Sequence, residues 1–167
     1  MRVRLRKKIL VVAVGNPDRA DDGVGALVGA RLARLLPPGV ALVVRTSDIL
    51  ALIEDWAGCD ALVCVDAAAP MGTPGRVHRI DLPTTEMLPA ESLGSSHGFG
   101  LTEAIAIARE LRVLPETVVI YAVEGKSFDG GASMTPAVAA AADDVAKQIV
   151  NEVGRLARIE TEAPRHA

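Results

Sequence analysis

The chain has 167 residues, 50% of them apolar, and 18 basic against 21 acidic residues leave a formal net charge of −3. The length is that of one ordinary domain. The large apolar share fits a compact core and excludes a disordered chain. There is no basic field to hold a phosphate backbone, and aromatic residues make up only 2%, so we expect no nucleic acid as a partner.

Short apolar runs alternate with helical patterns along the chain. The apolar runs predict strands at 8–15, 40–46, 61–67, 75–81 and 117–123. The helical patterns lie at 23–36, 49–56, 101–112 and from Pro136 toward Ile159, with Thr135 as a capping residue before the proline. The fourth strand carries arginines, which favour an edge of the sheet, and 84–96 has no regular pattern.

This order of elements predicts a three-layer α/β/α sandwich around a mostly parallel five-stranded sheet. We expect one domain over residues 1–159 and a disordered tail at 160–167. Short right-handed connections favour a flavodoxin-like or a phosphorylase/hydrolase-like arrangement with the first and third strands adjacent. Ligands bind such sheets at the carboxyl ends of the strands, so we expect a site where the first strand ends beside the third.

The chain carries no clear targeting signal. Its basic start precedes an apolar stretch of six residues, which is shorter than the core of a secretion signal and runs into a turn. No run of about 18 apolar residues predicts a membrane span. Cys59 and Cys64 lie about 16 Å apart if the chain between them is extended, too far for a disulfide. We therefore expect a cytoplasmic protein with no membrane partner.

Acidic residues follow both strands that meet at the expected site. The loop after the first strand contains Asp18, Asp21 and Asp22, whose charges exclude a phosphate-binding loop although glycines surround them. Asp21 and Asp22 also suit the start of a helix, where they favour the helix dipole. Asp66 comes after apolar residues near the end of the third strand and is expected to be partly desolvated, a cost in free energy that points to a partner or a function.

A histidine provides the third candidate group. His97 lies in the sequence Ser-Ser-His-Gly-Phe-Gly before a helix, whereas His78 and His166 lie in the edge strand and the tail and are expected to be solvated. Two carboxylates and one imidazole suit a divalent ion such as nickel, zinc or manganese. The same three groups also suit acid/base chemistry, and the residues alone do not decide between the two.

These motifs resemble those of the nickel–iron hydrogenase maturation proteases. The similarity is carried by three motifs in order, Asp-Asp22-Gly-Val-Gly, Val-Cys-Val-Asp66-Ala and Ser-Ser-His97-Gly-Phe-Gly-Leu. Two later segments, around Glu124 and Pro136, also resemble the family. Some members carry Asp-Gly-Gly-Thr after the second strand, where this chain has Arg-Thr-Ser-Asp, so the resemblance leaves open which hydrogenase is processed.

The resemblance implies an aspartyl-type endopeptidase, a hydrolase of protein processing. Its substrate would be the precursor of a nickel–iron hydrogenase large subunit, which loses a C-terminal extension after nickel insertion. Asp22, Asp66 and His97 would contact the nickel and act in catalysis. The precursor would supply this nickel, and no organic cofactor is implied.

Five further residues are expected near the site, and two other functions are alternatives to the protease. Residues that would contact substrate or shape loops are Asn16, Gly23, Asp48, Gly98 and Glu124. A non-proteolytic nickel-binding maturation chaperone and a metal-dependent hydrolase of a small molecule are the alternatives to the protease.

Overall fold

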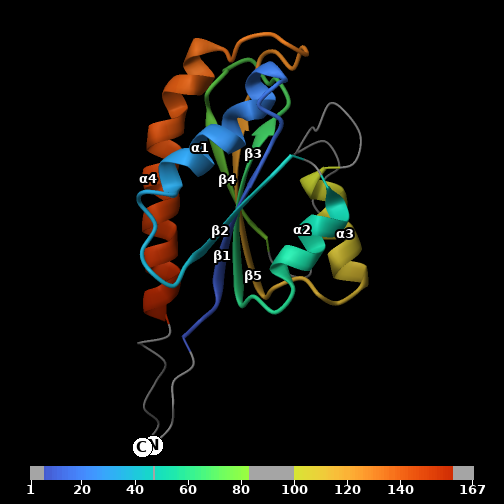
Figure 1. Ribbon diagram of the computed structural model, residues 1–167, viewed down its shortest axis with the longest axis vertical. Helices are drawn as coiled ribbons and strands as arrows, with labels where there is room; N and C mark the ends of the chain where they lie inside the picture. The colour runs from blue at the N-terminus through green and yellow to red at the C-terminus, as the bar shows by residue number, and fades with distance from the viewer. Residues whose placement is uncertain (1–5, 47, 83–99, 160–167) are drawn as a thin grey trace, which may run out of the picture.

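The computed structural model describes residues 6–46, 48–82 and 100–159 (Figure 1). Within these residues the strands are β1 (Ile9–Val14), β2 (Ala41–Arg45), β3 (Ala61–Ala68), β4 (Val77–Leu82) and β5 (Thr117–Glu124). The helices are α1 (Val24–Leu32), α2 (Ile49–Trp56), α3 (Leu101–Glu110) and α4 (Pro136–Ile159), and a short 3-10 helix, η1 (Ala20–Gly23), leads into α1. The predicted 84–96 segment and the tail at 160–167 lie outside the described residues.

The strands form one sheet in the order β2-β1-β3-β5-β4. β1, β2, β3 and β5 are parallel, and β4 pairs antiparallel with β5. The predicted sandwich, the neighbouring first and third strands and the edge position of the fourth strand are therefore confirmed. The order differs from the flavodoxin order, in which the fourth strand lies next to the third. The connection from β3 to β4 holds only the eight residues 69–76, too few for the crossover that a parallel strand requires.

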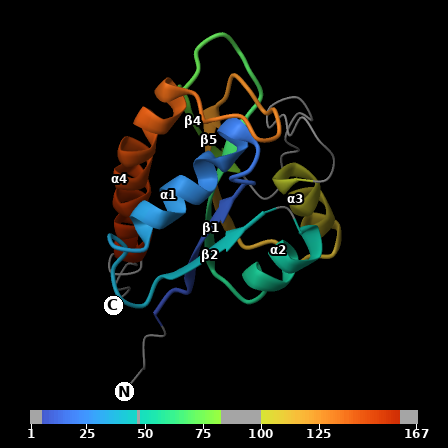
Figure 2. The same cartoon turned by 45° about the horizontal axis from the view of Figure 1, so that its top comes forward.

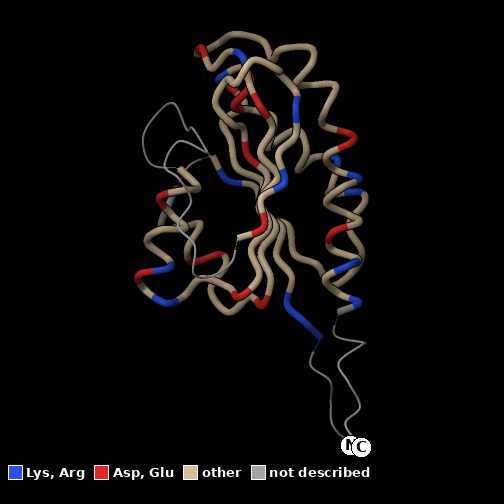
Figure 3. The backbone as a smooth tube through the Cα atoms, turned by 180° about the vertical axis from the view of Figure 1, so that it is seen from behind, with Lys and Arg blue, Asp and Glu red and all other residues tan. Residues whose placement is uncertain are grey.

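Two helical layers cover the two faces of the sheet, α1 with α4 and α2 with α3 (Figure 2). Successive side chains of a strand alternate between the faces. Val63 and Val65 of β3 therefore pack in the core beneath α1 and α4, while Leu62, Cys64 and Ala68 pack in the core beneath α2 and α3. Charged positions lie mainly on helices, loops and strand ends, with few along the middle of the sheet (Figure 3).

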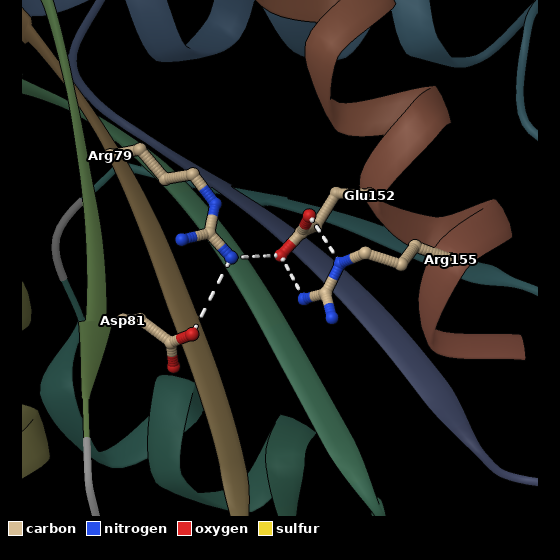
Figure 4. A network of polar contacts seen from close by, with 4 residues as sticks. All are labelled: Arg79, Asp81, Glu152 and Arg155. Atoms are coloured by element: carbon tan, nitrogen blue, oxygen red, sulfur yellow. Dashed lines mark hydrogen bonds and ion pairs between the residues drawn. The ribbon is translucent and has the colours of Figure 1, made fainter. Parts of the chain in front are cut away.

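A polar network ties α4 to the edge strand β4 (Figure 4). The buried carboxylate of Glu152 accepts hydrogen bonds from Arg79 Nη2 at 2.6 Å and from Arg155 Nη2 at 2.9 Å. Arg79 also lies 3.5 Å from Asp81 on the same strand. These charges fix one edge of the sheet against the longest helix.

Three smaller predictions can be compared with the structure. The helix predicted at 23–36 begins as η1 and its regular part ends at Leu32. Cys59 and Cys64 are both free thiols, as expected. In the described part of the chain, no helix is sufficiently long and apolar to cross a membrane.

Candidate functional site

Two glycines bring the loop after β1 close to the sheet. A Cβ on Gly15 would overlap the backbone oxygen of Asp22, and a Cβ on Gly25 would overlap that of Val14. Only a residue without a side chain permits such close backbone contact. η1 and the start of α1 therefore pack directly on the end of β1, and Asp22 is held at the carboxyl edge of the sheet.

Asp22 is half-buried and keeps one oxygen free. Its Oδ2 accepts a hydrogen bond from the backbone N–H of Asn16 at 3.0 Å, and Oδ1 receives none from any described residue. Asn16 Oδ1 in turn accepts from the N–H of Asp18 at 2.9 Å. A Cβ on Gly23 would lie 2.9 Å from Cα of Pro17. Asn16 and Gly23, predicted to contact substrate or to shape loops, thus shape the loop that carries Asp22.

Asp66 lies near the end of β3 and is buried, with 8% of its surface exposed. It alternates with Val65 and Ala67, so its side chain faces the α2–α3 layer. Oδ1 accepts from the N–H of Ala67 at 2.8 Å, and Oδ2 has no hydrogen bond within the described part of the chain. The pKa of Asp66 is raised well above its usual range, mainly by burial and secondly by the negative charge of Asp22. The two carboxylates, here called the carboxylate pair, are therefore close enough to interact.

The third predicted group, His97, lies outside the described residues, as does Gly98. Gly100, three residues after His97, donates its N–H to Glu103 Oε2 at 2.7 Å and starts α3. α3 covers the face toward which Asp66 points, and it begins near the edge where β1 and β3 end (Figure 1). The role of His97 stays a prediction, and within the described residues no group of three His, Cys, Asp or Glu residues could hold a metal ion.

Asp21 has a structural role that the sequence did not reveal. Its fully buried carboxylate accepts from the backbone N–H groups of Lys126, Ser127 and Thr135 at 2.6–3.0 Å and from the Thr135 hydroxyl at 2.7 Å. Burial alone would raise the pKa of Asp21, but these hydrogen bonds outweigh it and the pKa is lowered. Asp21 therefore fastens η1 to the loop between β5 and α4, and the hydroxyl of Thr135, predicted as a helix cap, donates to Asp21.

Glu124 and Asp48 also shape loops. The buried Oε1 of Glu124 accepts from the N–H groups of Met71 at 2.7 Å and Thr73 at 2.6 Å, which fixes the connection between β3 and β4. His78, predicted to be solvated, is instead half-buried, with Nε2 3.7 Å from Oε2 of Glu124. The reason is that β4 lies against β5, where Glu124 ends the strand. Asp48 caps α2 by accepting from the N–H of Ala51 at 3.1 Å.

Comparison with known proteins identifies the family. A family model described as hydrogenase maturation protease matches residues 30–152, a range that includes Asp66 and His97 and begins after Asp22. The chain belongs to the hydrogenase maturation protease family. The family and the hydrolase class predicted from the motifs are thereby confirmed, and this protease is an endopeptidase of hydrogenase maturation. No curated protein matches the chain.

Solved structures share the fold of the protease. The hydrogenase maturating endopeptidase HybD from E. coli is 22% identical, with a TM-score of 0.71 over 89% of this chain and 93% of that chain. The NiFe hydrogenase maturation protease HycI from Thermococcus kodakarensis KOD1 is 24% identical, with a TM-score of 0.67 over 87% and 91%. HybD from Thermococcus kodakarensis is also 24% identical, with a TM-score of 0.68 over 90% and 99%. At sequence identities this low, the similarity shows a shared fold.

Proposed function

We propose that the protease removes the C-terminal extension of a nickel–iron hydrogenase large-subunit precursor after nickel insertion. Asp22, Asp66 and His97 recognise the nickel that the precursor carries. The observation that supports this most is the carboxylate pair, in which each side chain has one oxygen that accepts from a backbone N–H and one oxygen to which no described residue donates. Two free carboxylate oxygens and an imidazole are suitable ligands for a divalent transition metal.

The charge of the pair supports the same proposal. Two neighbouring carboxylates repel each other, and burial makes the charged form of Asp66 still less favourable. A divalent cation relieves both costs. Three protein ligands leave coordination positions open, which suits an ion already bound by another protein. In this proposal the nickel is part of the substrate, and the protease needs neither a resident metal nor an organic cofactor.

The chain's carboxylates are the best candidates for proton transfer during cleavage. Cys64 is fully buried, and burial raises the pKa of its thiol; burial also raises the pKa of Cys59. Neither cysteine therefore has the thiolate character of a nucleophile. We propose that water attacks the scissile carbonyl carbon and that Asp66 or Asp22 accepts the proton of the water. The same carboxyl group then gives this proton to the nitrogen of the leaving C-terminal fragment as the C–N bond breaks. The substrate's nickel would orient the precursor and polarise the carbonyl or the water.

A processing assay tests the proposal. The protease is incubated with the nickel-loaded precursor and, separately, with the nickel-free precursor, and the mass of the large subunit is measured. We expect shortening of the loaded precursor alone. Binding without a change of mass would indicate a nickel-binding chaperone, and indifference to both precursors would leave the small-molecule hydrolase.

Substitutions in one loop provide the matched control. Asp22→Ala and His97→Ala should abolish processing, because each removes a nickel contact. Asp18→Ala, in the same loop as Asp22, should leave processing normal. Asp18 is exposed, and its hydrogen bonds within the loop are made by its backbone. Full activity of the Asp22→Ala, His97→Ala double variant would refute the proposed site.

A further inference from the structure

The strand β2 has a free edge. It lies at the end of the sheet, and β1 is its only neighbour among the described strands. The N–H of Gly15, which follows β1, donates to the backbone oxygen of Arg45 at 2.9 Å, so the backbone groups of Arg45 point toward β1. Because these groups alternate along a strand, the N–H and C=O groups of Leu42 and Val44 point away from β1. The edge therefore offers hydrogen-bond donors and acceptors to another extended chain.

The two edges of the sheet differ in their protection. On β4, the charged side chains of Arg79 and Asp81 lie along the edge strand, and Arg79 is anchored to Glu152 (Figure 4). Such charges discourage pairing with another chain. β2 reads Ala-Leu-Val-Val-Arg, and Val44 is 48% exposed. Its one charged side chain, that of Arg45, forms a bidentate ion pair with Asp55 of α2, with N–O distances of 2.7 and 2.8 Å.

The free edge of β2 ends at the same side of the sheet as the carboxylate pair. Val14 pairs with Arg45, and Ala13 pairs with Val65, so β1, β2 and β3 end at the same side of the sheet. Neighbouring strands are about 4.8 Å apart, so a chain added to β2 would lie about 10 Å from β1, the strand that leads to Asp22. A chain added to β4 would be separated from β1 by β5 and β3 as well as by β4 itself.

We infer that the free edge of β2 binds the cleavage segment of the precursor as an added β-strand, which delivers the scissile bond to the carboxylate pair. The inference rests on the proposed function. A polypeptide substrate in extended form presents backbone donors and acceptors, which the outward N–H and C=O groups of Leu42 and Val44 do not find in the described strands. Leu50, 71% exposed at the start of α2, and Val44 provide apolar contacts beside the added strand.

A proline on each edge tests this inference. Val44→Pro removes an outward N–H and adds a ring on the side of the added strand, a position at which an edge strand tolerates proline. Val77→Pro in β4 is the matched control: Arg76 accepts from the N–H of Glu124 at 2.9 Å, so the N–H of the next residue, Val77, points outward. We expect Val44→Pro to raise KM for the nickel-loaded precursor at least tenfold with little change in kcat, as loss of one or two hydrogen bonds would do. Val77→Pro should stay within about twofold of the unsubstituted protease, with thermal unfolding of both variants as the check on folding.

A second measurement uses the unsubstituted protease and does not depend on the folding of a variant. Prolines are placed one at a time at successive precursor residues beside the cut. Since only alternate residues of an added strand bond to β2, processing should fall at every second position. A uniform effect along the segment, or an unchanged KM for Val44→Pro, would overturn the inference and leave the proposed function in place. If the unsubstituted protease is a dimer and Val44→Pro dissociates it without changing KM, the edge of β2 binds a second copy of the protease. That result would also overturn the inference. If the unsubstituted protease does not cut the loaded precursor, the proposed function itself fails.

Discussion

Substitution by alanine should affect mainly stability at Asp21 and mainly processing at Asp22. Asp21→Ala removes the acceptor of four hydrogen bonds that join η1 to the loop before α4. Asp22→Ala removes one hydrogen bond to Asn16 and one member of the carboxylate pair. We expect the first substitution to lower stability and the second to abolish processing.

The magnitudes follow from the contacts. A hydrogen bond to a charged group contributes about 1.5–3 kcal/mol. Four such bonds to Asp21 do not add fully, because water can reach the half-buried Ser127 and Thr135 and because the cost of burying the carboxylate also disappears. A net loss of about 2–4 kcal/mol remains, which lowers Tm by roughly 4–16 °C for a domain of this size. Asp22→Ala should cost only about 0.5–1.5 kcal/mol, or at most about 6 °C, because Asp22 is half-buried and its repulsion with Asp66 disappears together with its one hydrogen bond.

Two assays on the same preparations check this prediction. Urea denaturation gives the free energy of unfolding of each variant, and the processing assay gives the fraction of nickel-loaded precursor shortened. Asp21→Ala is measured for processing at a temperature at which it is folded. Equal destabilisation by the two substitutions, or an Asp21→Ala variant within about 0.5 kcal/mol of the unsubstituted protein, would refute the division of roles.

Other substitutions test the remaining contacts. Gly25→Ala should destabilise strongly and reduce processing because its Cβ would overlap the Val14 oxygen, whereas Gly130→Ala, in open space, should change the free energy of unfolding little. Asp66→Asn should stop processing while the free energy of unfolding stays within about 1 kcal/mol or rises, because it removes a buried charge. Burial raises the pKa of Glu152, but its two arginine partners lower it further, to below its usual value, so its contribution to stability is present above the unfolded pKa of about 4.3 and is lost as the pH falls. Glu152→Gln should therefore flatten the loss of stability between about pH 5 and pH 3 in urea titrations, by about 1 kcal/mol because the arginines are partly exposed.

Much of the fold could be predicted because the strands and helices carry strong local signals. β1, β3 and β5 consist mainly of apolar residues and are buried on both faces, and the bounds predicted for α2 are those observed. The position of β5 between β3 and β4 was not predicted, because strand order depends on contacts between distant segments such as Ala68 and Glu124. The sequence does contain one signal for this order, because the predicted strands 61–67 and 75–81 leave a connection that is too short for a parallel crossover.

The site could be predicted only in part, for a related reason. Asp66 could be predicted as a site residue because a carboxylate next to apolar strand residues is desolvated whatever the order of the strands. Asp21 and Asp22 are neighbours with the same local signal, and their roles differ because the donors to Asp21 lie 105–114 residues further along the chain. No pattern within the loop after β1 carries that information.

Glu124 shows why burial of a carboxylate is not by itself the mark of this site. Like Asp66, it lies near the end of a mainly apolar strand and is buried, and it pairs with Ala68, which is two residues after Asp66. One of its oxygens accepts two backbone N–H groups and the other lies near His78, so the carboxylate is occupied by the loop between β3 and β4. Among residues 6–46, 48–82 and 100–159, Asp66 accepts a single hydrogen bond, from its own neighbour, and its other oxygen accepts none, while the charge of Asp22 acts on it. The free oxygen, which depends on the tertiary contacts around each carboxylate, is therefore what separates the proposed nickel contact from the structural carboxylates around it.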